Sequence, residues 1–398
     1  MSNLEVQQLT DKHVMNTYAR FPMALVRGEG ARVWDADGKG YLDFVAGIAV
    51  NSLGHCHPAV AKAVSEQVRS LIHVSNLYHI EPQARLAKAL CDHSFADRVF
   101  FCNSGAEANE AAIKLARRYG SEQAGGRSEV ITALNSFHGR TLATLTATGQ
   151  EKIRLGYDPL PSGFRYVPFN DLDAAEDAVD ERTAAILVEP IQGEGGVVVP
   201  DESYIRGLRQ LCDDKGLLLI FDEVQVGMGR TGRLFGYEHF GVEPDVMTLA
   251  KALGGGLPLG AMLAREEVAK SFPPGSHAST FGGNPVVCSA GLAVMKTILE
   301  AGLVEHCEAM GAELRQGLEA LAQRFGFIRE VRGKGLLLGM EMDRECGPMV
   351  QECMNEGLLV VLAGANVLRM VPPLTIEKAD VDEALEILGR VLERVQGS

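Results

Sequence analysis

The segment LLLIFDEVQ, residues 217–225, sets the fold class, because an apolar run ends abruptly in two carboxylates. Similar compact apolar runs, each followed at once by polar or glycine residues, occur at 99–102, 130–133, 185–188 and 246–249. Strands that are buried on both faces of a mostly parallel sheet have this pattern. Helical apolar spacing is found at 61–72, 81–92 and 107–119. The alternation predicts an α/β protein with a mostly parallel central sheet flanked by helices.

Two of these runs end in residues that suit one cofactor. Ligands bind beyond the carboxyl ends of parallel strands, where Asp222 follows the run 217–221 and Lys251 follows the run 246–249. Each residue alone has a common explanation, since strands often end in a capping or metal-binding Asp, or in a solvated Lys. Together they fit pyridoxal phosphate (PLP). Asp222 would keep the pyridine nitrogen protonated, and Lys251 would bond to the aldehyde and later move a proton.

A phosphate group also needs a cradle, and CNSGAE at 102–107 lies between a predicted strand and an alanine-rich helix. Backbone amides at the start of that helix, with the Ser104 hydroxyl, would hold a dianion. A plain Ser/Gly helix cap explains the same residues equally well. Thr280, in the turn-forming segment STFGGNP at 279–285, is a second candidate for a phosphate contact.

The pattern of apolar residues changes after Pro285. It predicts long amphipathic helices around one strand pair at 327–331 and 336–342. We expect residues 61–285 to form a large cofactor-binding domain and residues 286–398 to form a smaller α+β domain. Residues 1–60 are expected to contribute to the small domain and to the active site.

The composition argues against several classes of protein. With 398 residues and a formal net charge of −14, the chain has no basic stripe of the kind that nucleic-acid binding needs. Its longest apolar runs fall far short of the ~20 residues of a membrane span, and its N-terminus resembles no secretory or transit peptide. We therefore expect a cytoplasmic protein. The eight cysteines include no CxxC pair, and His55-Cys56-His57 lacks a second ligand pair, which predicts reduced thiols and no metal site.

Several segments resemble one enzyme family. They are NSGAEANEAA (103–112), SFHGRT (136–141), VEPIQGEGG (188–196), FDEVQVGMGRTG (221–232), AKALGGG (250–256) and STFGGNP (279–285). In this order and spacing they resemble the class III, ornithine-type aminotransferases of PLP fold type I, and the similarity covers nearly the whole chain. The resemblance implies a homodimer with shared active sites, in which Thr280 reaches the phosphate of the neighbouring subunit. It also implies cofactor contacts from Ser104, Gly105, Ala106, Phe137, Asp222, Glu223, Val224, Gln225 and Lys251.

Within the family, the segments 15–22, 43–58 and 366–374 are most similar to members that act on N2-acetylornithine, with 2-oxoglutarate as the amino acceptor. The resemblance implies that Arg140, helped by Ser279, binds the α-carboxylate of the donor. It implies that Arg369 binds the α-carboxylate of glutamate or 2-oxoglutarate, and that Glu194 pairs with Arg369 until that substrate arrives.

The choice of substrate leaves alternatives. Ile48 stands where members acting on free ornithine carry a tyrosine, which favours an acylated donor, and Asn76 and Tyr78 would line the acyl end. N2-succinylornithine and succinyldiaminopimelate are alternative donors, because both share the distal amine and the α-carboxylate. An aminomutase would need no second carboxylate clamp. A non-catalytic PLP-binding protein would be expected to lose the lysine or the phosphate loop.

Overall fold

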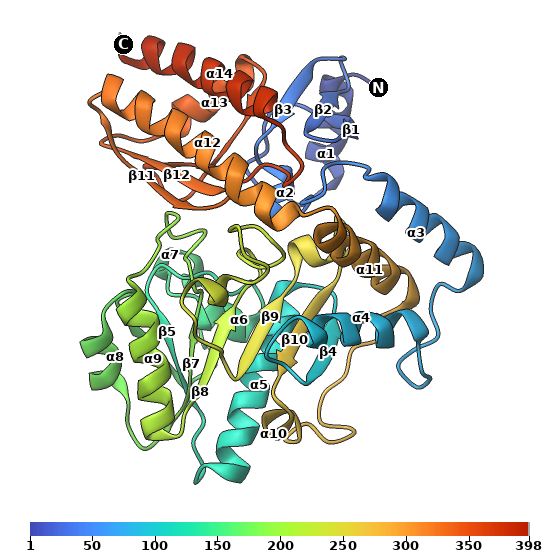
Figure 1. Ribbon diagram of the computed structural model, residues 1–398, viewed down its shortest axis with the longest axis vertical. Helices are drawn as coiled ribbons and strands as arrows, with labels where there is room; N and C mark the ends of the chain where they lie inside the picture. The colour runs from blue at the N-terminus through green and yellow to red at the C-terminus, as the bar shows by residue number, and fades with distance from the viewer. Residues whose placement is uncertain (397–398) are drawn as a thin grey trace.

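The computed structural model describes residues 1–396, and its largest element is a seven-stranded sheet with the order β4-β10-β9-β8-β7-β5-β6 (Figure 1). Its strands are β4 (Arg98–Cys102), β5 (Glu129–Ala133), β6 (Phe164–Val167), β7 (Thr183–Val188), β8 (Leu218–Asp222), β9 (Val246–Leu249) and β10 (Gly260–Ala264). The pairings among β9, β8, β7, β5 and β6 are parallel, and β10 runs antiparallel to both of its neighbours. The predicted α/β fold with a mostly parallel sheet is confirmed.

The central strands are apolar because protein covers both of their faces. Every residue of β7, β8 and β9 is buried, as expected for strands inside an α/β sheet. Helix α5 packs across β10, β9 and β7, while α9 packs against β7 and β8. The helices of this part of the chain are α3 (Pro58–Ser70), α4 (Glu81–Asp92), α5 (Gly105–Gln123), α6 (Leu142–Ala147), α7 (Glu151–Arg154), α8 (Leu172–Ala178), α9 (Glu202–Lys215), α10 (Glu266–Ala269), and the short 3-10 helices η1 (Gly236–His239) and η2 (Lys251–Gly254).

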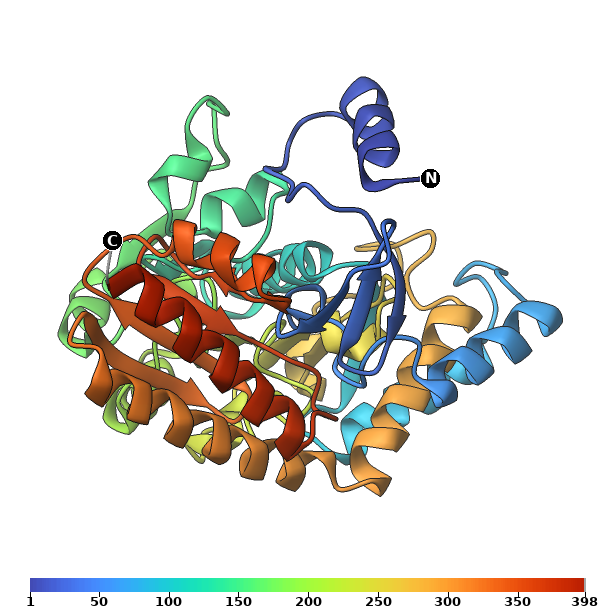
Figure 2. The same ribbon diagram turned by 90° about the horizontal axis from the view of Figure 1, so that it is seen from above.

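A second sheet lies in the C-terminal part of the chain. It has the order β11-β12-β15-β14 and is antiparallel throughout. Its strands are β11 (Ile328–Lys334), β12 (Leu337–Met342), β14 (Val361–Leu362) and β15 (Val367–Met370). The helices that accompany it are α12 (Leu303–Arg324), α13 (Gly347–Asn355) and α14 (Lys378–Gln396), and α12 and α14 pack against each other (Figure 2). The predicted strand pair and long helices after Pro285 are confirmed.

The N-terminal segment forms a third, small sheet beside the second one. Its elements are α1 (Asn3–His13), β1 (Leu25–Glu29), β2 (Arg32–Asp35), β3 (Gly40–Asp43) and α2 (Ala46–Ala49). Strand β13 (Leu358–Leu359) from the C-terminal part completes this sheet by pairing in parallel with β3. Helix α11 (Pro285–Glu300) packs against α3 and α4. The division of the chain at residues 60 and 285 stays a prediction.

Among residues 1–396, no single helix is long and apolar enough to cross a membrane, although α11 and α12 together, bent by 68°, meet the length and composition criteria as a pair.

Candidate active site

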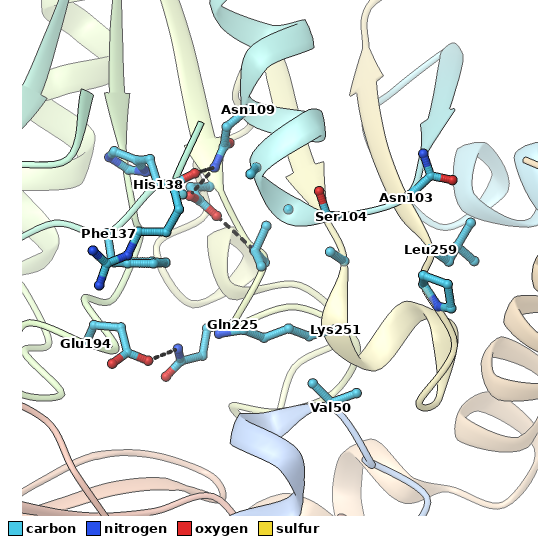
Figure 3. Close-up of a pocket in the computed structure, with 18 of the residues that line it drawn as sticks. Val50, Asn103, Ser104, Asn109, Phe137, His138, Glu194, Gln225, Lys251 and Leu259 are labelled. Atoms are coloured by element: carbon cyan, nitrogen blue, oxygen red, sulfur yellow. Dashed lines mark hydrogen bonds and ion pairs between the residues drawn. The ribbon is translucent and has the colours of Figure 1, made fainter. Parts of the chain in front are cut away.

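A cavity of about 490 Å³ opens where several strands of the central sheet end (Figure 3). Its walls come from the segments that follow β4, β5, β7, β8 and β9, and from Val50, which follows α2. The strand ends therefore meet at one edge, as the pattern of buried runs predicted. The predicted site residues that line the cavity are Ser104, Gly105, Ala106, Phe137, Arg140, Glu194, Asp222, Val224, Gln225 and Lys251.

Lys251 enters the cavity from the end of β9. It is the first residue of η2, and its φ of 43° lies in the left-handed region, a costly conformation for a residue with a side chain. Its side chain extends toward Gln225 (Figure 3). Burial lowers the pKa of the Lys251 amine, and the negative charge of Glu194 offsets part of this effect. A lowered pKa increases the fraction of neutral amine, which is the nucleophilic form.

Asp222, the last residue of β8, is 3% exposed and held by a network of donors. Its Oδ2 accepts a hydrogen bond from Asn109 Nδ2 (2.7 Å) and lies 2.8 Å from His138 Nδ1, while its Oδ1 accepts one from the backbone amide of Val224 (3.0 Å). The Thr248 hydroxyl in turn donates to Asn109 Oδ1 at 2.8 Å. The carboxylate is thus fixed in orientation at the cavity wall, as holding a proton on a ring nitrogen requires.

The start of α5 faces the same cavity. Ser104 is the N-cap residue, and its Oγ accepts a hydrogen bond from the Glu107 amide at 3.2 Å, so the predicted helix cap is present. Within residues 1–396, the backbone amides of Gly105 and Ala106 have no acceptor. A Cβ atom at Gly105 would lie 2.8 Å from Val224 Cγ1, so this close approach needs glycine. Two free amides at a helix N-terminus are a suitable site for a phosphate.

These residues fit PLP chemically. An amine, a fixed carboxylate and a pair of free helix-terminal amides line one cavity, together with the Phe137 ring and the Val224 side chain. The amine suits the aldehyde of PLP, and the carboxylate suits its pyridine nitrogen. The two amides suit its phosphate, and the Phe137 and Val224 side chains suit the two faces of its ring. The individual contacts of these residues with the cofactor stay predictions.

The two arginines predicted to bind carboxylates differ in their surroundings. Arg140 lines the cavity with an exposed side chain, and its guanidinium lies 5.6 Å from the centre of the Phe137 ring. Among residues 1–396 it has no ion-pair partner. Arg369 is 1% exposed, and its Nη1 donates to Glu194 Oε1 (2.7 Å) and Gln225 Oε1 (2.8 Å). Arg140 is therefore open to a carboxylate, whereas Arg369 is covered.

Glu194 also has a second partner, because its Oε1 accepts a hydrogen bond from Gln225 Nε2 at 3.2 Å. Burial raises the pKa of Glu194, but the positive charges of Arg369 and Lys251 outweigh it and leave the pKa lowered. Glu194 is therefore a carboxylate at neutral pH and attracts the Arg369 guanidinium. The predicted pairing of Glu194 with Arg369 is present in the structure.

A further carboxyl group, Glu189, lines the cavity and was not predicted as a site residue. It accepts hydrogen bonds from the backbone amides of Phe137 (3.1 Å) and Gly193 (3.2 Å). Burial raises the pKa of Glu189 to about 7. Glu189 thus joins the segment that carries Phe137 to the loop that carries Glu194.

Glu223, another predicted cofactor contact, has its partners outside the cavity, and its contact with the cofactor stays a prediction. Its two carboxyl oxygens accept hydrogen bonds from the backbone amides of Gly236 (2.5 Å) and Tyr237 (2.7 Å), and it does not line the cavity. Side chains of successive residues point to opposite sides of an extended segment, so Glu223 turns away when Asp222 faces the site. Its carboxyl group holds the first two residues of η1.

Other predicted residues lie near the cavity without lining it. Ser279 Oγ accepts hydrogen bonds from Asn103 Nδ2 (3.2 Å) and the Gly282 amide (3.0 Å), and Asn103 does line the cavity. Thr280 is exposed. Asn76 Nδ2 donates to the Ser279 and Gly282 carbonyls, which places the 76–78 segment beside the 279–282 turn. The exposed residues Ile48 and Tyr78 are 39% and 68% accessible.

Sequence reasoning missed Asn109, His138 and Thr248 in the Asp222 network. Asn109 is 1% exposed in a helix face that is otherwise alanine-rich, and His138 is 2% exposed beside Phe137. A buried polar residue must find a hydrogen-bond partner, so a polar position within an apolar helix face was the available signal. The partner itself could be identified only from the structure.

Comparison with known proteins agrees with this geometry. The family model "Aminotransferase class-III" matches residues 14–392. The acetylornithine aminotransferase of Caldanaerobacter subterraneus subsp. tengcongensis is 54% identical over 387 residues, covering 97% of this chain and 98% of its own. That of Methanocaldococcus jannaschii is 50% identical, with 98% of each chain covered. The ornithine aminotransferase of Toxoplasma gondii, in a structure with PLP at partial occupancy in the active site, has a TM-score of 0.95 and 33% identity, covering 99% of this chain and 95% of its own. The chain belongs to the class III aminotransferases.

Proposed function

We propose that this chain uses PLP to transfer the distal amino group of N2-acetylornithine to 2-oxoglutarate, giving N-acetylglutamate 5-semialdehyde and glutamate, a step of arginine biosynthesis. The observation that carries the proposal is the contrast between Arg140, which lines the cavity, and Arg369, which lies behind the cavity-lining residues Glu194 and Gln225. Arg140 is exposed and has no ion-pair partner in the described part of the chain, whereas Arg369 is covered by Glu194. Two substrates that place their carboxylates differently can therefore use the same amine-bearing cavity in turn.

The residues around Lys251 would perform the chemistry. Bound PLP supplies an aldehyde carbon that bonds to amines and a ring that withdraws electrons from the carbon bearing the amino group. The Lys251 amine, which lines the same cavity, would take a proton from that carbon and move it between the substrate carbon and the cofactor. Asp222, fixed by Asn109 and the Val224 amide, would hold a proton on the ring nitrogen throughout.

The arginines would orient the two substrates. Arg140 offers a planar guanidinium to the α-carboxylate of the donor, so the distal amine of the donor faces Lys251. Glutamate and 2-oxoglutarate react at their α-carbon, so their α-carboxylate must bind closer to the reacting atoms, at Arg369. Glu194 has to leave Arg369 before a substrate carboxylate can bind there, because Nη1 of Arg369 already donates hydrogen bonds to Glu194 and Gln225.

The acylated donor is favoured over free ornithine by two observations. Ile48 offers no hydrogen-bond acceptor to a free α-ammonium group. The relatives at 50–54% identity are acetylornithine aminotransferases, whereas the ornithine aminotransferase structure is 33% identical. We therefore place N2-acetylornithine first and N2-succinylornithine second among donors.

The proposed enzyme is a cytoplasmic homodimer with shared active sites. Support for the dimer comes from an exposed apolar surface next to Thr280. Its members Ile72, Leu77, Tyr78 and Phe281 are between 61% and 84% exposed. The ring of His73 lies 5.4 Å from that of Phe281, so the two segments form one surface. Large exposed apolar patches of this kind mark interfaces between proteins, and Thr280 would reach the neighbouring phosphate from here.

Comparison of amino donors tests the proposed function. Glutamate formation from 2-oxoglutarate should be fastest with N2-acetylornithine when N2-succinylornithine, ornithine and 4-aminobutyrate are supplied at equal concentration. Loss of the acyl contact should cost ornithine at least about tenfold in kcat/KM, the usual value of a small apolar group in a pocket. Faster reaction with ornithine or 4-aminobutyrate would contradict the assigned substrate but not the class of enzyme.

Replacing Glu194 with alanine should change substrate preference. The Glu194→Ala variant uncovers Arg369, so the kcat/KM of glutamate as amino donor should rise relative to that of N2-acetylornithine, by roughly tenfold for one lost charge-assisted pair. Separate measurement of the two half-reactions checks this. A ratio equal to that of the wild type would show that Glu194 is not a gate.

A further inference from the structure

The loop of residues 193–198, here called the gate loop because it carries Glu194, is attached to the small C-terminal sheet at two points. Arg369 Nη1 on β15 donates to the Glu194 side chain at 2.7 Å. Arg332 Nε on β11 donates to the backbone carbonyl of Gly196 at 2.9 Å. The first contact is the gate itself, and the second lies two residues further along the same loop.

The two arginines belong to one row of the sheet. Arg332 pairs with Gly339 between β11 and β12, and Gly339 pairs with Arg369 between β12 and β15. Directly opposed residues of antiparallel strands have their side chains on the same face. Arg332 and Arg369 therefore point to the same side of the sheet and flank Gly339, which has no side chain.

The gate loop occupies the gap above Gly339. A Cβ atom at Gly339 would lie 3.0 Å from Val197 Cβ, so Val197 packs directly on the glycine backbone. Val197 is completely buried and has a φ of 54°. A β-branched residue in the left-handed region is strained, and such strain persists only where the surroundings enforce it. The shape of the gate loop thus depends on this face of the sheet.

Arg332 is itself held in place. Its Nη1 donates to Glu330 Oε2 at 2.7 Å and also contacts Glu341, and its side chain is 18% exposed. Both carboxylates come from β11 and β12, the strands of the small sheet. The Arg332 guanidinium is therefore a fixed part of the sheet, and the gate loop is the element that it restrains.

We propose that Arg332 is a specificity-determining positioning residue: it holds the backbone of the gate loop against the small sheet and so keeps Glu194 on Arg369. This inference rests on the proposed function, in which Glu194 must leave Arg369 before glutamate or 2-oxoglutarate binds. Arg332 does not line the cavity that holds Lys251 and Asp222. It sets how readily the gate opens, and therefore sets the balance between the two half-reactions.

The test uses the PLP-loaded enzyme with Arg332→Met, which keeps an unbranched side chain as far as the position of Nε and removes all the donors. Arg315→Met is the matched control, because Arg315 on α12 donates to the Val331 and Gly333 carbonyls of the same strand without contacting the gate loop. In Arg332→Met, the kcat/KM of glutamate relative to N2-acetylornithine should rise by roughly tenfold, the value of one hydrogen bond from a charged donor. Arg332→Lys should restore part of the wild-type ratio.

Hydrogen exchange of the amides at 193–198 gives a readout that does not depend on activity. Faster exchange there in Arg332→Met, with no change in Arg315→Met, supports the restraint. An unchanged ratio, an equal fall of both half-reactions, or unchanged exchange at 193–198 would overturn the inference. If the wild type does not transaminate these substrates, the proposed function fails, and the exchange comparison still decides whether Arg332 holds the gate loop.

Discussion

Lys251→Ala should abolish turnover, lowering kcat by at least about 10⁴-fold, the upper range for removing a positioned proton-transfer group. Lys251 is the cavity-lining amine, and it is presented from a left-handed backbone conformation at the end of β9. Burial lowers its pKa, so that the amine can act as nucleophile and base. Steady-state rates with acetylornithine and 2-oxoglutarate provide the measurement.

Loss of activity in Lys251→Ala must be separated from loss of the fold or of the cofactor. Lys114→Ala is the matched control, because Lys114 lies on α5, pairs with His277 (2.9 Å) and does not line the cavity. It should retain activity. Borohydride reduction of the loaded wild type should attach PLP covalently to the peptide containing Lys251, and the variant should show no such label. Labelling at another lysine would contradict the assignment.

Asp222→Asn should lower kcat by about 10²-fold to 10³-fold, the usual cost of losing one preorganised charge at a reacting group. The carboxylate of Asp222 accepts hydrogen bonds from Asn109 and the Val224 amide. An amide in its place cannot hold a proton on a ring nitrogen, and its NH2 group would oppose one of these donors. PLP should still bind, since the free amides of Gly105 and Ala106 are unchanged.

The measurement for Asp222→Asn compares kcat with the amount of PLP retained after dialysis. The matched control is Asp245→Asn, at the residue before β9. The Asp245 carboxylate accepts hydrogen bonds from Arg209 and from the Leu219 amide and does not line the cavity. That change should lower the midpoint of thermal unfolding with kcat largely retained. Wild-type turnover in Asp222→Asn would show that this carboxylate does not support the chemistry.

The strands and helices that could be predicted are those with a strong local pattern. The buried runs that became β4, β5, β7, β8 and β9 consist almost entirely of apolar residues, so their type was clear. Strand β10 was not predicted, because GAMLA at 260–264 consists largely of small residues and follows a glycine-rich segment. Strand β13 has two residues, and only its pairing with β3 makes it a strand.

The site was predictable in its residues but not in its geometry. Asp222 and Lys251 come after the apolar runs 217–221 and 246–249, which the sequence shows clearly. Because the carboxyl ends of parallel strands lie at one edge of the sheet, the two residues are expected to be close together. The partners of Asp222 could not be found in this way, because Asn109 and Thr248 come from separate elements that meet only in the folded chain. The same holds for the row of Arg332, Gly339 and Arg369, whose register depends on tertiary pairing.

The central claim is that the cavity at Lys251 and Asp222 holds PLP and passes an amino group between two substrates. The most direct test is the visible absorption of the purified, PLP-loaded protein during stepwise addition of substrates without turnover. We expect N2-acetylornithine alone to abolish the visible band of the lysine-bound cofactor, and subsequent 2-oxoglutarate, after removal of the donor, to restore it with release of one glutamate per site. A band that neither substrate changes, in a protein with PLP bound, would contradict the account.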